Sequence, residues 1–205
     1  MKKIISGKIL LGAAALAVFA ATFFAKPEQV RADSTLEGTK RASSIPGTSG
    51  VTATLHVTAD AVLILDTDLR YQFLVIDNGK RLTIVDDGVD PVNTLTINNS
   101  ANRHPCLSDG GLLTITGGKV QLEGGAAGGY LNVKTLNITG GTVESLADSC
   151  GISADNITIS GGTVHLTCPL TPIEARNSIR ITGGNIEARS ENGPGIYSGG
   201  TVNIS

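Results

Sequence analysis

Four polar residues recur at nearly equal spacing in the second half of the chain. They are Gln121, Glu144, His165 and Glu187, and Lys119 lies two positions before the first of them. If the repeats stack as neighbouring β-strands, each side chain lies about 4.8 Å from the next. Such a polar strip can bind an extended polysaccharide through hydrogen bonds and charge. Two interpretations therefore stay open: a carbohydrate-binding face made of these five residues, or a solvated face on which any polar residue is tolerated.

The same strip contains the carboxylates that a polysaccharide-cleaving enzyme would need. Glu144 and Glu187 are two repeats apart, about 9–10 Å at the usual strand spacing, with His165 between them. An inverting hydrolase uses two carboxylates at such a separation. The connecting loops are short and predict no enclosing cleft, so the sequence favours a non-catalytic segment.

Acidic residues cluster in the first half of the chain, at Asp66, Asp68, Asp86, Asp87 and Asp90. Calcium binds six to eight oxygen ligands, and aspartate-rich turns can supply several of them. Their spacing matches neither an EF-hand nor the glycine- and aspartate-rich calcium repeats. Aspartate is also a common turn residue. Two interpretations therefore stay open: a calcium site, or turn-forming aspartates with no metal.

The histidine and cysteine residues show no zinc-binding spacing, and His56 and His104 are isolated. Cys106, Cys150 and Cys168 are an odd number of cysteines. Cys106 and Cys150 are two repeats apart, which at about 9–10 Å is too far for a disulfide. Cys150 could pair with Cys168 only through a bent loop, so we expect buried thiols.

The elements that position these residues are predicted by a phrase that recurs four times. Its first glycines are Gly117, Gly140, Gly161 and Gly183, which gives a nearly constant period of about 22 residues. Short β-branched strands separated by glycine turns at this period are typical of a solenoid. The phrase reads Leu-Thr-Ile-Thr-Gly-Gly at 113–118, Leu-Asn-Ile-Thr-Gly-Gly at 136–141, Ile-Thr-Ile-Ser-Gly-Gly at 157–162 and Ile-Arg-Ile-Thr-Gly-Gly at 179–184.

Each repeat contains three short strands in which every second residue faces inward. The glycine pair after the first strand allows the chain to turn a corner. Stacking then places like residues over one another, which predicts an all-β, right-handed parallel β-helix with rungs of about 22 residues. The inward residues are Leu113, Ile115, Leu136, Ile138, Ile157, Ile159, Ile179 and Ile181 in the first strands, Val120, Val143, Val164 and Ile186 in the second, and Leu131, Ile152, Ile173 and Ile196 in the third.

The remaining segments predict a division of the chain into four parts. Residues 1–32 have a basic start and an apolar run from Ile9 to Phe24, typical of a signal peptide cleaved after Ala32 or, as an alternative, after Ala25. Residues 33–50 are polar and predict a linker. Residues 51–111 predict divergent first rungs that cap the solenoid, and residues 112–205 its regular repeats. The last repeat stops where the next glycine pair is expected, which predicts further repeats or domains beyond Ser205.

Composition narrows the partners of the exported chain. The leader holds five of the 16 basic residues and one of the 18 acidic residues, so the rest carries a net charge of −6. This charge disfavours nucleic acid, which requires a basic patch. The apolar run is short for a membrane-spanning helix, so we expect no integral membrane protein once the leader is cleaved. Few aromatic residues remain to stack on sugars: Tyr71, Phe73, Tyr130 and Tyr197.

Two sequence features carry a family resemblance over about residues 51–205. Gly-Lys-Arg-Leu-Thr-Ile-Val-Asp-Asp-Gly at 79–88 is followed by Leu-Thr-Ile at 95–97 and by serial Ile-Thr-Gly-Gly-Thr-Val units. The chain thereby resembles secreted Firmicutes surface proteins and is similar to β-helical carbohydrate-binding domains that bind calcium and acidic or cellulosic polysaccharides. The resemblance implies a parallel β-helix, calcium as a cofactor and a glycan as the partner. Those relatives often carry Gly-Asp-Gly-Ile in the variable loop, whereas the acidic residue is missing at 149–152 and 192–196 here.

Together these patterns predict a secreted or cell-surface module for adhesion or polysaccharide binding. The ligand would be a polysaccharide or a cell-wall glycan. Two alternatives stay open: the non-catalytic N-terminal part of a larger polysaccharide lyase or hydrolase, and a purely structural spacer rod.

Overall fold

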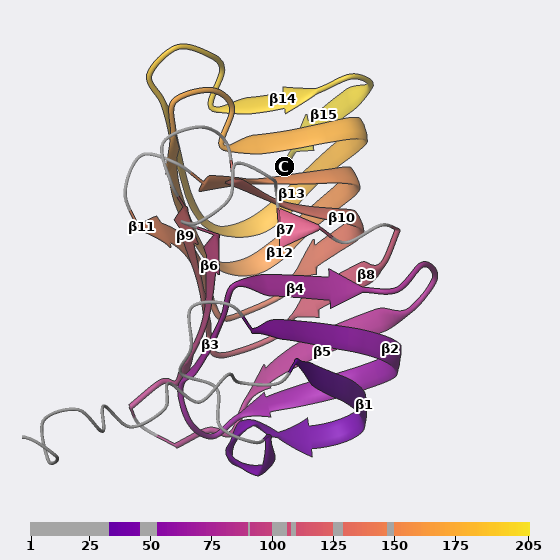
Figure 1. The fold of residues 1–205 in the computed structure, drawn as a ribbon. Helices are drawn as coiled ribbons and strands as arrows, with labels where there is room; N and C mark the ends of the chain where they lie inside the picture. The colour runs from indigo at the N-terminus through magenta and orange to yellow at the C-terminus, as the bar shows by residue number, and fades with distance from the viewer. Residues whose placement is uncertain are drawn as a thin grey trace, which may run out of the picture. The chain divides into compact units, whose positions relative to one another are not determined.

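The computed structural model describes residues 33–45, 53–89, 91–99, 106–107, 110–124, 129–146 and 150–205. Apart from one short 3-10 helix, η1 (Ala42–Ser44), the described elements are strands of a single sheet in which every pair is parallel. The sheet winds into a right-handed stack of coils that rises toward the C-terminus (Figure 1). The predicted parallel β-helix is therefore confirmed. The predicted signal peptide, residues 1–32, lies outside the described residues.

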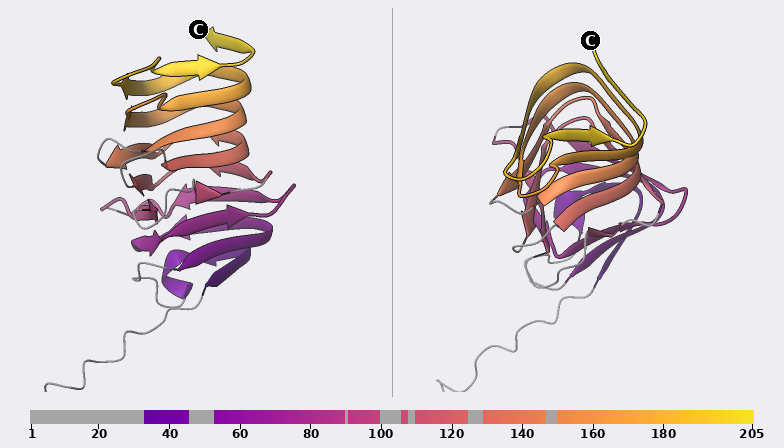
Figure 2. Two further views of the ribbon diagram at one scale, coloured as in Figure 1. Left: turned by 45° about the horizontal axis from the view of Figure 1, so that its top comes forward. Right: turned by 90° about the horizontal axis from the view of Figure 1, so that it is seen from above.

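Each coil between the first and the last contributes one strand segment to each of three faces, and the coils superpose along the stack (Figure 2). Face 1 contains the second halves of β1 (Ser34–Arg41) and β2 (Thr54–Leu65), then β5 (Arg81–Asp86), β8 (Leu112–Ile115), the second half of β10 (Gly129–Ile138), the middle of β12 (Cys150–Cys168) and of β13 (Ile173–Ser190), and β15 (Thr201–Ile204). Face 2 contains β3 (Leu69–Tyr71), β6 (Thr94–Asn99), β9 (Lys119–Gly124), β11 (Thr142–Leu146) and the ends of β12 and β13. Face 3 contains the first parts of β1, β2, β10, β12 and β13, together with β4 (Phe73–Ile76), β7 (Cys106–Leu107) and β14 (Ile196–Ser198).

The coils stack in register, so the inward residues form aliphatic ladders. Leu136 pairs with Ile157 and Ile157 with Ile179, so one coil of the structure corresponds to one repeat of the sequence. Every inward residue predicted from the repeat is buried except Ile186 and Ile196, which are partly buried and pack against the core. Burying an aliphatic side chain of this size contributes about 1.5–3 kcal/mol. The ladders are thus the main source of stability.

The linker predicted at residues 33–50 is wrong for its first part. Residues Ser34–Arg41 form β1, which pairs with β2 in register, and η1 follows directly. Leu36 is fully buried and pairs with Val57. Leu36 is the only large apolar side chain that β1 buries, and the outward positions of the strand are polar and solvent-exposed. This composition made the segment look like a linker in the sequence. Residues 46–50 lie outside the described residues.

The divergent rungs at residues 51–111 are as long as the regular repeats or longer. Ala61 pairs with Leu82, so the coil between them is as long as a regular repeat, and Leu82 pairs directly with Leu113. The coil from Leu82 to Leu113 is longer than a regular repeat because the connections before and after β6 are longer than in later coils. The same stacking therefore continues across the expected boundary between divergent and regular repeats.

Glycine pairs allow the coils to approach each other at the corner between faces 1 and 2. A Cβ at the first glycine of a pair would lie 2.5 Å from the Thr139 carbonyl oxygen at Gly161, and 2.7 Å from the Ser160 carbonyl oxygen at Gly183. The second glycine has a positive φ, +80° at Gly162 and +97° at Gly184. Both positions require glycine, the first because of space and the second because of space and backbone conformation.

This corner makes a prediction about Gly162→Ala. Its new Cβ would lie 2.7 Å from the carbonyl oxygen of Gly141 in the preceding coil. Gly88 has nearly the same φ, +79°, but open space around it, so Gly88→Ala is a matched control. The control carries only the left-handed strain, about 1–2 kcal/mol. We expect Gly162→Ala to lower the free energy of unfolding by a further 1–3 kcal/mol or so, because the coils must separate. Urea denaturation measures both; equal losses would contradict the contact.

Candidate functional site

The structure brings the predicted carbohydrate-binding residues together on face 2. Gln121 pairs with Glu144, Glu144 with His165, and His165 with Glu187, so these four side chains form one outward column across β9, β11, β12 and β13. Lys119 lies in the neighbouring column, where it pairs with Thr94 on one side and Thr142 on the other. Adjacent strands in a sheet are about 4.8 Å apart, which sets the spacing of the column.

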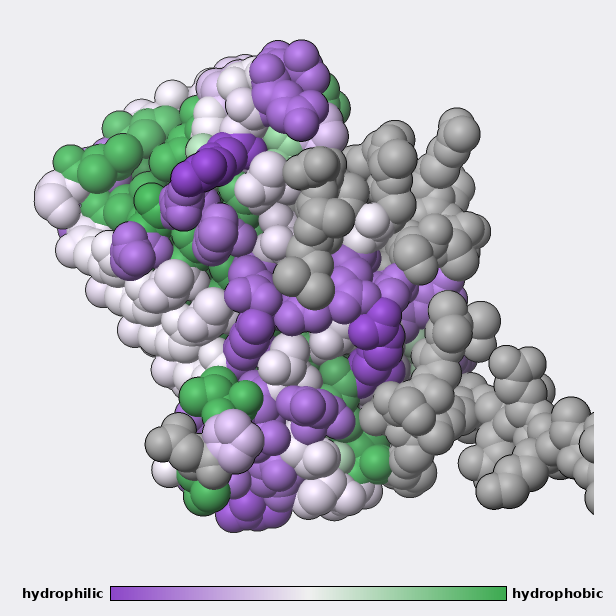
Figure 3. Space-filling view, turned by 90° about the vertical axis from the view of Figure 1, so that its left-hand side faces the viewer, coloured by the Kyte–Doolittle hydropathy of each residue, from purple (hydrophilic) through white to green (hydrophobic). Residues whose placement is uncertain are grey.

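The column is longer than the repeat predicted. Arg70 on β3 pairs with Thr96 on β6, and Thr96 pairs with Gln121. Six strands therefore contribute one residue each to this column, and Thr96 is the one buried member. Hydrophilic side chains gather in a band on this side of the molecule (Figure 3).

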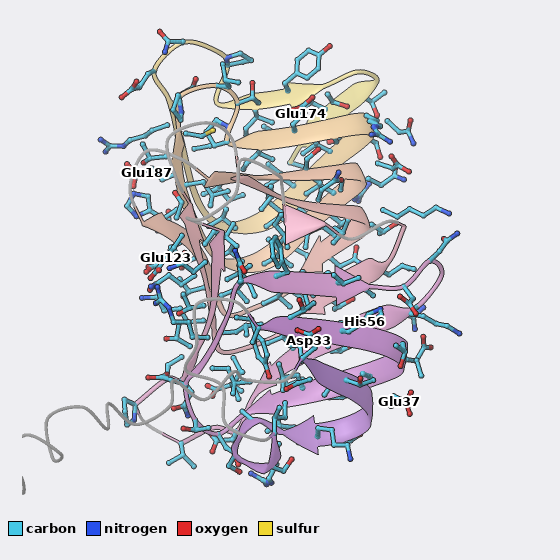
Figure 4. All side chains as sticks on the ribbon, viewed as in Figure 1. Asp33, Glu37, His56, Glu123, Glu174 and Glu187 are labelled. Carbon is cyan, nitrogen blue, oxygen red and sulfur yellow. The ribbon has the colours of Figure 1, made fainter. Side chains whose placement is uncertain are left out.

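The upper part of face 2 is held by two sets of ion pairs. Lys119 Nζ lies 2.6 Å from Glu144 Oε1. The carboxylate of Glu187 contacts both the guanidinium of Arg189 and His165 Nε2, the latter at 3.4 Å. The Glu144 side chain is only 22% exposed, whereas the His165 and Glu187 side chains are 55% and 43% exposed. Glu187, which is labelled in Figure 4, is therefore more exposed than Glu144.

The lower part of face 2 is organised by Glu123, which the sequence analysis did not single out. Its carboxylate forms an ion pair with Arg70 and accepts hydrogen bonds from Gln121 Nε2 at 2.9 Å and Asn98 Nδ2 at 2.8 Å. Glu123 follows Gln121 by two positions, so strand alternation alone could have placed it on this face. Arg70 could not have been found this way, because its register depends on the irregular connection between β3 and β6.

The arrangement of face 2 suits binding by hydrogen bonds and charge. Glu144 and Glu187 are two strands apart with His165 between them, as the repeat predicted. Each carboxylate already has a basic partner on its own face, Lys119 or Arg189. The charges of three glutamates and three basic residues on face 2 cancel. These residues are Glu123, Glu144, Glu187, Arg70, Lys119 and Arg189.

The aspartates predicted as calcium ligands do not form one group. Asp68 Oδ1 accepts the backbone N–H of Thr94 at 2.8 Å, and Asp87 Oδ1 accepts that of Val89 at 3.0 Å. One carboxylate oxygen of Asp86 is buried and has no hydrogen-bond partner among the described residues. Within the described ranges, no group of three histidine, cysteine or acidic residues could hold a metal ion. Asp90 lies outside the described residues.

Asp66 has a structural role instead. Its carboxylate accepts the Ser43 backbone N–H at 2.8 Å and the Ser43 hydroxyl at 2.7 Å, and Arg41 lies 3.5 Å away. These hydrogen bonds, first that of the hydroxyl and then that of the backbone, hold the pKa of Asp66 below its ordinary value. Asp66 therefore fastens η1 to the end of β2.

One surface hollow lies away from face 2. It has a volume of about 620 Å³ and opens at the corner between faces 3 and 1. None of the predicted carbohydrate-binding residues lines it. Asp77 does, and its carboxylate is 2.7 Å from His56 Nε2. His56 is thus paired with an acid, whereas His104 lies outside the described residues.

The cysteines and aromatic residues occupy structural positions as far as they are described. Cys168 is buried. The β7 strand that contains Cys106 and the β12 strand that begins at Cys150 pair on opposite sides of β10, so they are two strands apart as predicted. Tyr71 is fully buried, and Tyr197 is half-exposed on face 3. Neither lies outward on face 2.

Comparison of the chain with protein-family models, curated proteins and solved structures finds no match. In the part of the chain that the structure describes, no helix is long and apolar enough to cross a membrane.

The contacts of Asp66 predict an acid-dependent loss of stability. Because its pKa is lower in the folded state, this carboxylate stabilises the fold above the pKa of the unfolded chain, and the contribution is lost as pH falls through the folded pKa. Ser43→Ala removes the hydroxyl hydrogen bond and raises the pKa of Asp66. We expect the difference in unfolding free energy between native protein and variant to shrink as pH falls below about 4.

Ser44→Ala is the control for this prediction. The Ser44 hydroxyl donates to the Arg41 carbonyl oxygen at 2.6 Å and does not contact Asp66. Denaturation between pH 7 and pH 2 should show that the difference in unfolding free energy between the native protein and Ser44→Ala does not change with pH. If the difference for Ser43→Ala is also independent of pH, Asp66 does not cause the acid-dependent loss of stability.

Proposed function

We propose that this protein is an exported, non-catalytic β-solenoid that binds an extended polysaccharide along face 2. The polymer lies parallel to the solenoid axis and crosses the outward column from Arg70 to Glu187. The module acts as a rigid rod that attaches to, or presents, a glycan at the cell surface. The leader pattern of residues 1–32 supports export.

The observation that supports this proposal best is the register of face 2. Each of six successive strands adds one residue to the same column, and all but Thr96 are at least partly exposed. A flat, periodic row of donors and acceptors matches a ligand that is itself linear and periodic. A compact small molecule would use only a short stretch of such a row.

The alternative function is a polysaccharide-cleaving enzyme or a part of one, for which Glu144 and Glu187 are the candidate carboxylates. Each of these already pairs with a base on its own face, Lys119 or Arg189. Among the described residues, face 2 itself supplies no opposing wall to enclose a sugar ring between acid and base. Binding without cleavage therefore fits face 2 better.

Replacing Gln121, Glu144, His165 and Glu187 together by serine tests the proposal. These side chains point outward, so the fold should be retained, as circular dichroism and thermal denaturation can verify. We expect the variant to lose at least tenfold in retention on insoluble cell-wall glycan or plant polysaccharide at low salt, since several charge-assisted hydrogen bonds disappear.

The control removes two carboxylates elsewhere, through Glu37→Ser and Glu174→Ser, which matches the two glutamates removed from face 2. Both residues lie away from Glu123 and Glu187 (Figure 4). The control should bind like the native protein. Unchanged retention of the face 2 variant would exclude this face, and release of reducing or unsaturated ends by the native protein would support the enzyme instead.

A further inference from the structure

Face 1 differs from face 2 in carrying few charged residues on its outward side, among them Arg81 and Arg180. On the five strands from β5 to β13, its central outward column consists of Thr83, Thr114, Asn137, Thr158 and Arg180, and it continues to Val62 on β2 and Asn203 on β15. These residues alternate with the buried leucines and isoleucines of the core, and the first four are partly exposed. Of the five, only Arg180 is charged.

Two further columns flank the central one. The preceding column contains Arg81, Leu112, Thr135, Asn156, Ser178 and Thr201. On the other side, Val85, Thr116, Thr139 and Ser160 each directly follow an inward isoleucine of the paired strands. Apart from Arg81, all of these side chains are uncharged, and most end in a hydroxyl or an amide. On this threonine-rich surface, Arg81 lies at the β5 end and Arg180 lies between Thr158 and Asn203.

The polar groups of the central column have no partner within the described protein. Thr83, Thr114, Asn137 and Thr158 make no side-chain hydrogen bond or ion pair with other described residues. In the flanking columns, by contrast, the Thr116 hydroxyl donates to the Ile84 carbonyl oxygen at 3.0 Å, and the Thr139 hydroxyl to that of Ile115 at 3.4 Å. The central column therefore offers free donors and acceptors.

The charged groups of face 2, by contrast, already have partners within the protein. Its carboxylates are already bonded to Lys119, Arg70, Arg189 and neighbouring amides. A ligand on face 2 must exchange with these contacts, and the charged ones weaken as salt rises. A ligand on face 1 displaces only water.

We infer that face 1 is a second binding surface, specific for neutral, hydroxyl-rich glycan chains that lie along the solenoid axis. Uncharged hydroxyl and amide groups give no advantage to a charged polymer, and they can donate to and accept from sugar hydroxyls. The threonine methyl groups add apolar contact in a flat array. The inference shares with the proposed function only the assumption of a glycan ligand, because it concerns a different face.

The effect of salt concentration on retention distinguishes binding at face 1 from binding at face 2. At 1 M salt the Debye length is about 3 Å, so contributions from exposed charges on face 2 are strongly screened. Hydrogen bonds and apolar contacts on face 1 are affected far less. Retention of the native protein on microcrystalline cellulose and on chitin should therefore persist at high salt, about 1 M sodium chloride, while retention on polygalacturonate should not.

The first test replaces Thr83, Thr114 and Thr158 together by valine. Valine keeps the shape and the strand propensity of threonine but removes the hydroxyl. Loss of several hydrogen bonds should weaken binding to cellulose or chitin at high salt by about tenfold or more. The matched control is the same change at Thr94, Thr142 and Thr163, which form an outward column on face 2. The control should bind normally at high salt.

The second test is a gain of binding that misfolding cannot produce. Arg180 is exposed, makes no side-chain hydrogen bond or ion pair with another described residue and interrupts the central column next to Thr158. Arg180→Thr extends the uncharged column by one strand. We expect a several-fold stronger retention on neutral glycans at high salt, because one more hydroxyl faces the polymer.

These variants separate this inference from the proposed function. Salt-resistant binding that survives the valine substitutions on face 1, or is lost equally in the face 2 control, would overturn it. So would an absence of salt-resistant binding in the native protein. If the serine variant of face 2 loses retention at low salt but keeps it at high salt, the result supports binding at face 1. Conversely, retention that depends on face 1 alone would support this inference and overturn the proposed function.

Discussion

The close approach of successive coils at the glycine corner is the constraint on which the rest of the structure depends. Gly141, Gly162 and Gly184 stack with positive φ, and a Cβ at Gly162 or Gly184 would lie within about 3 Å of a carbonyl oxygen in the coil before. In the four regular coils this contact lies where the face 1 strand ends and the face 2 strand begins. It holds these coils in one register, which allows the aliphatic ladders to form.

Strict register has an electrostatic consequence for the outer surface. Two like charges at adjacent positions in a column would repel by about 1 kcal/mol even in water. The chain avoids this on face 2, since His165 separates Glu144 from Glu187 and each glutamate has a base beside it. Charges therefore gather on face 2 as paired groups, whereas the outer side of face 1 is mostly threonine, serine and asparagine. The same periodicity gives two surfaces of different chemistry.

Much of the architecture could be predicted because the period of the repeat equals the length of one coil. The inward columns follow from strand alternation, and the outward column from Gln121 to Glu187 follows from the same period. The first coils were harder to predict. The corner between β2 and β3 has Asp66 and Asp68 in place of a glycine pair. Both of these aspartates, which resembled metal ligands in the sequence, accept backbone N–H groups, from Ser43 and Thr94.

The parts of the site that the sequence did not reveal depend on pairing across irregular connections. Arg70 reaches Glu123, which is distant in the chain, only because β3 stacks below β6 and β6 below β9. No local period encodes that pairing. The threonine-rich surface of face 1 was hidden for another reason. Its residues belong to the repeated phrase itself, and a repeated threonine is equally typical of a strand that has no ligand. Only the structure shows that the hydroxyl groups of the central column have no partner among the described residues.

Carboxylate footprinting of the native protein tests the central claim most directly. A carbodiimide with an amine labels exposed carboxyl groups, and mass spectrometry locates the labels in the presence and absence of the polysaccharide. An axial ligand on face 2 should protect Glu123, Glu144 and Glu187 together and leave Glu37 and Glu174 unchanged. Protection of Glu37 or Glu174 in their place, or no protection under conditions where the polymer is bound, would contradict the assignment of face 2.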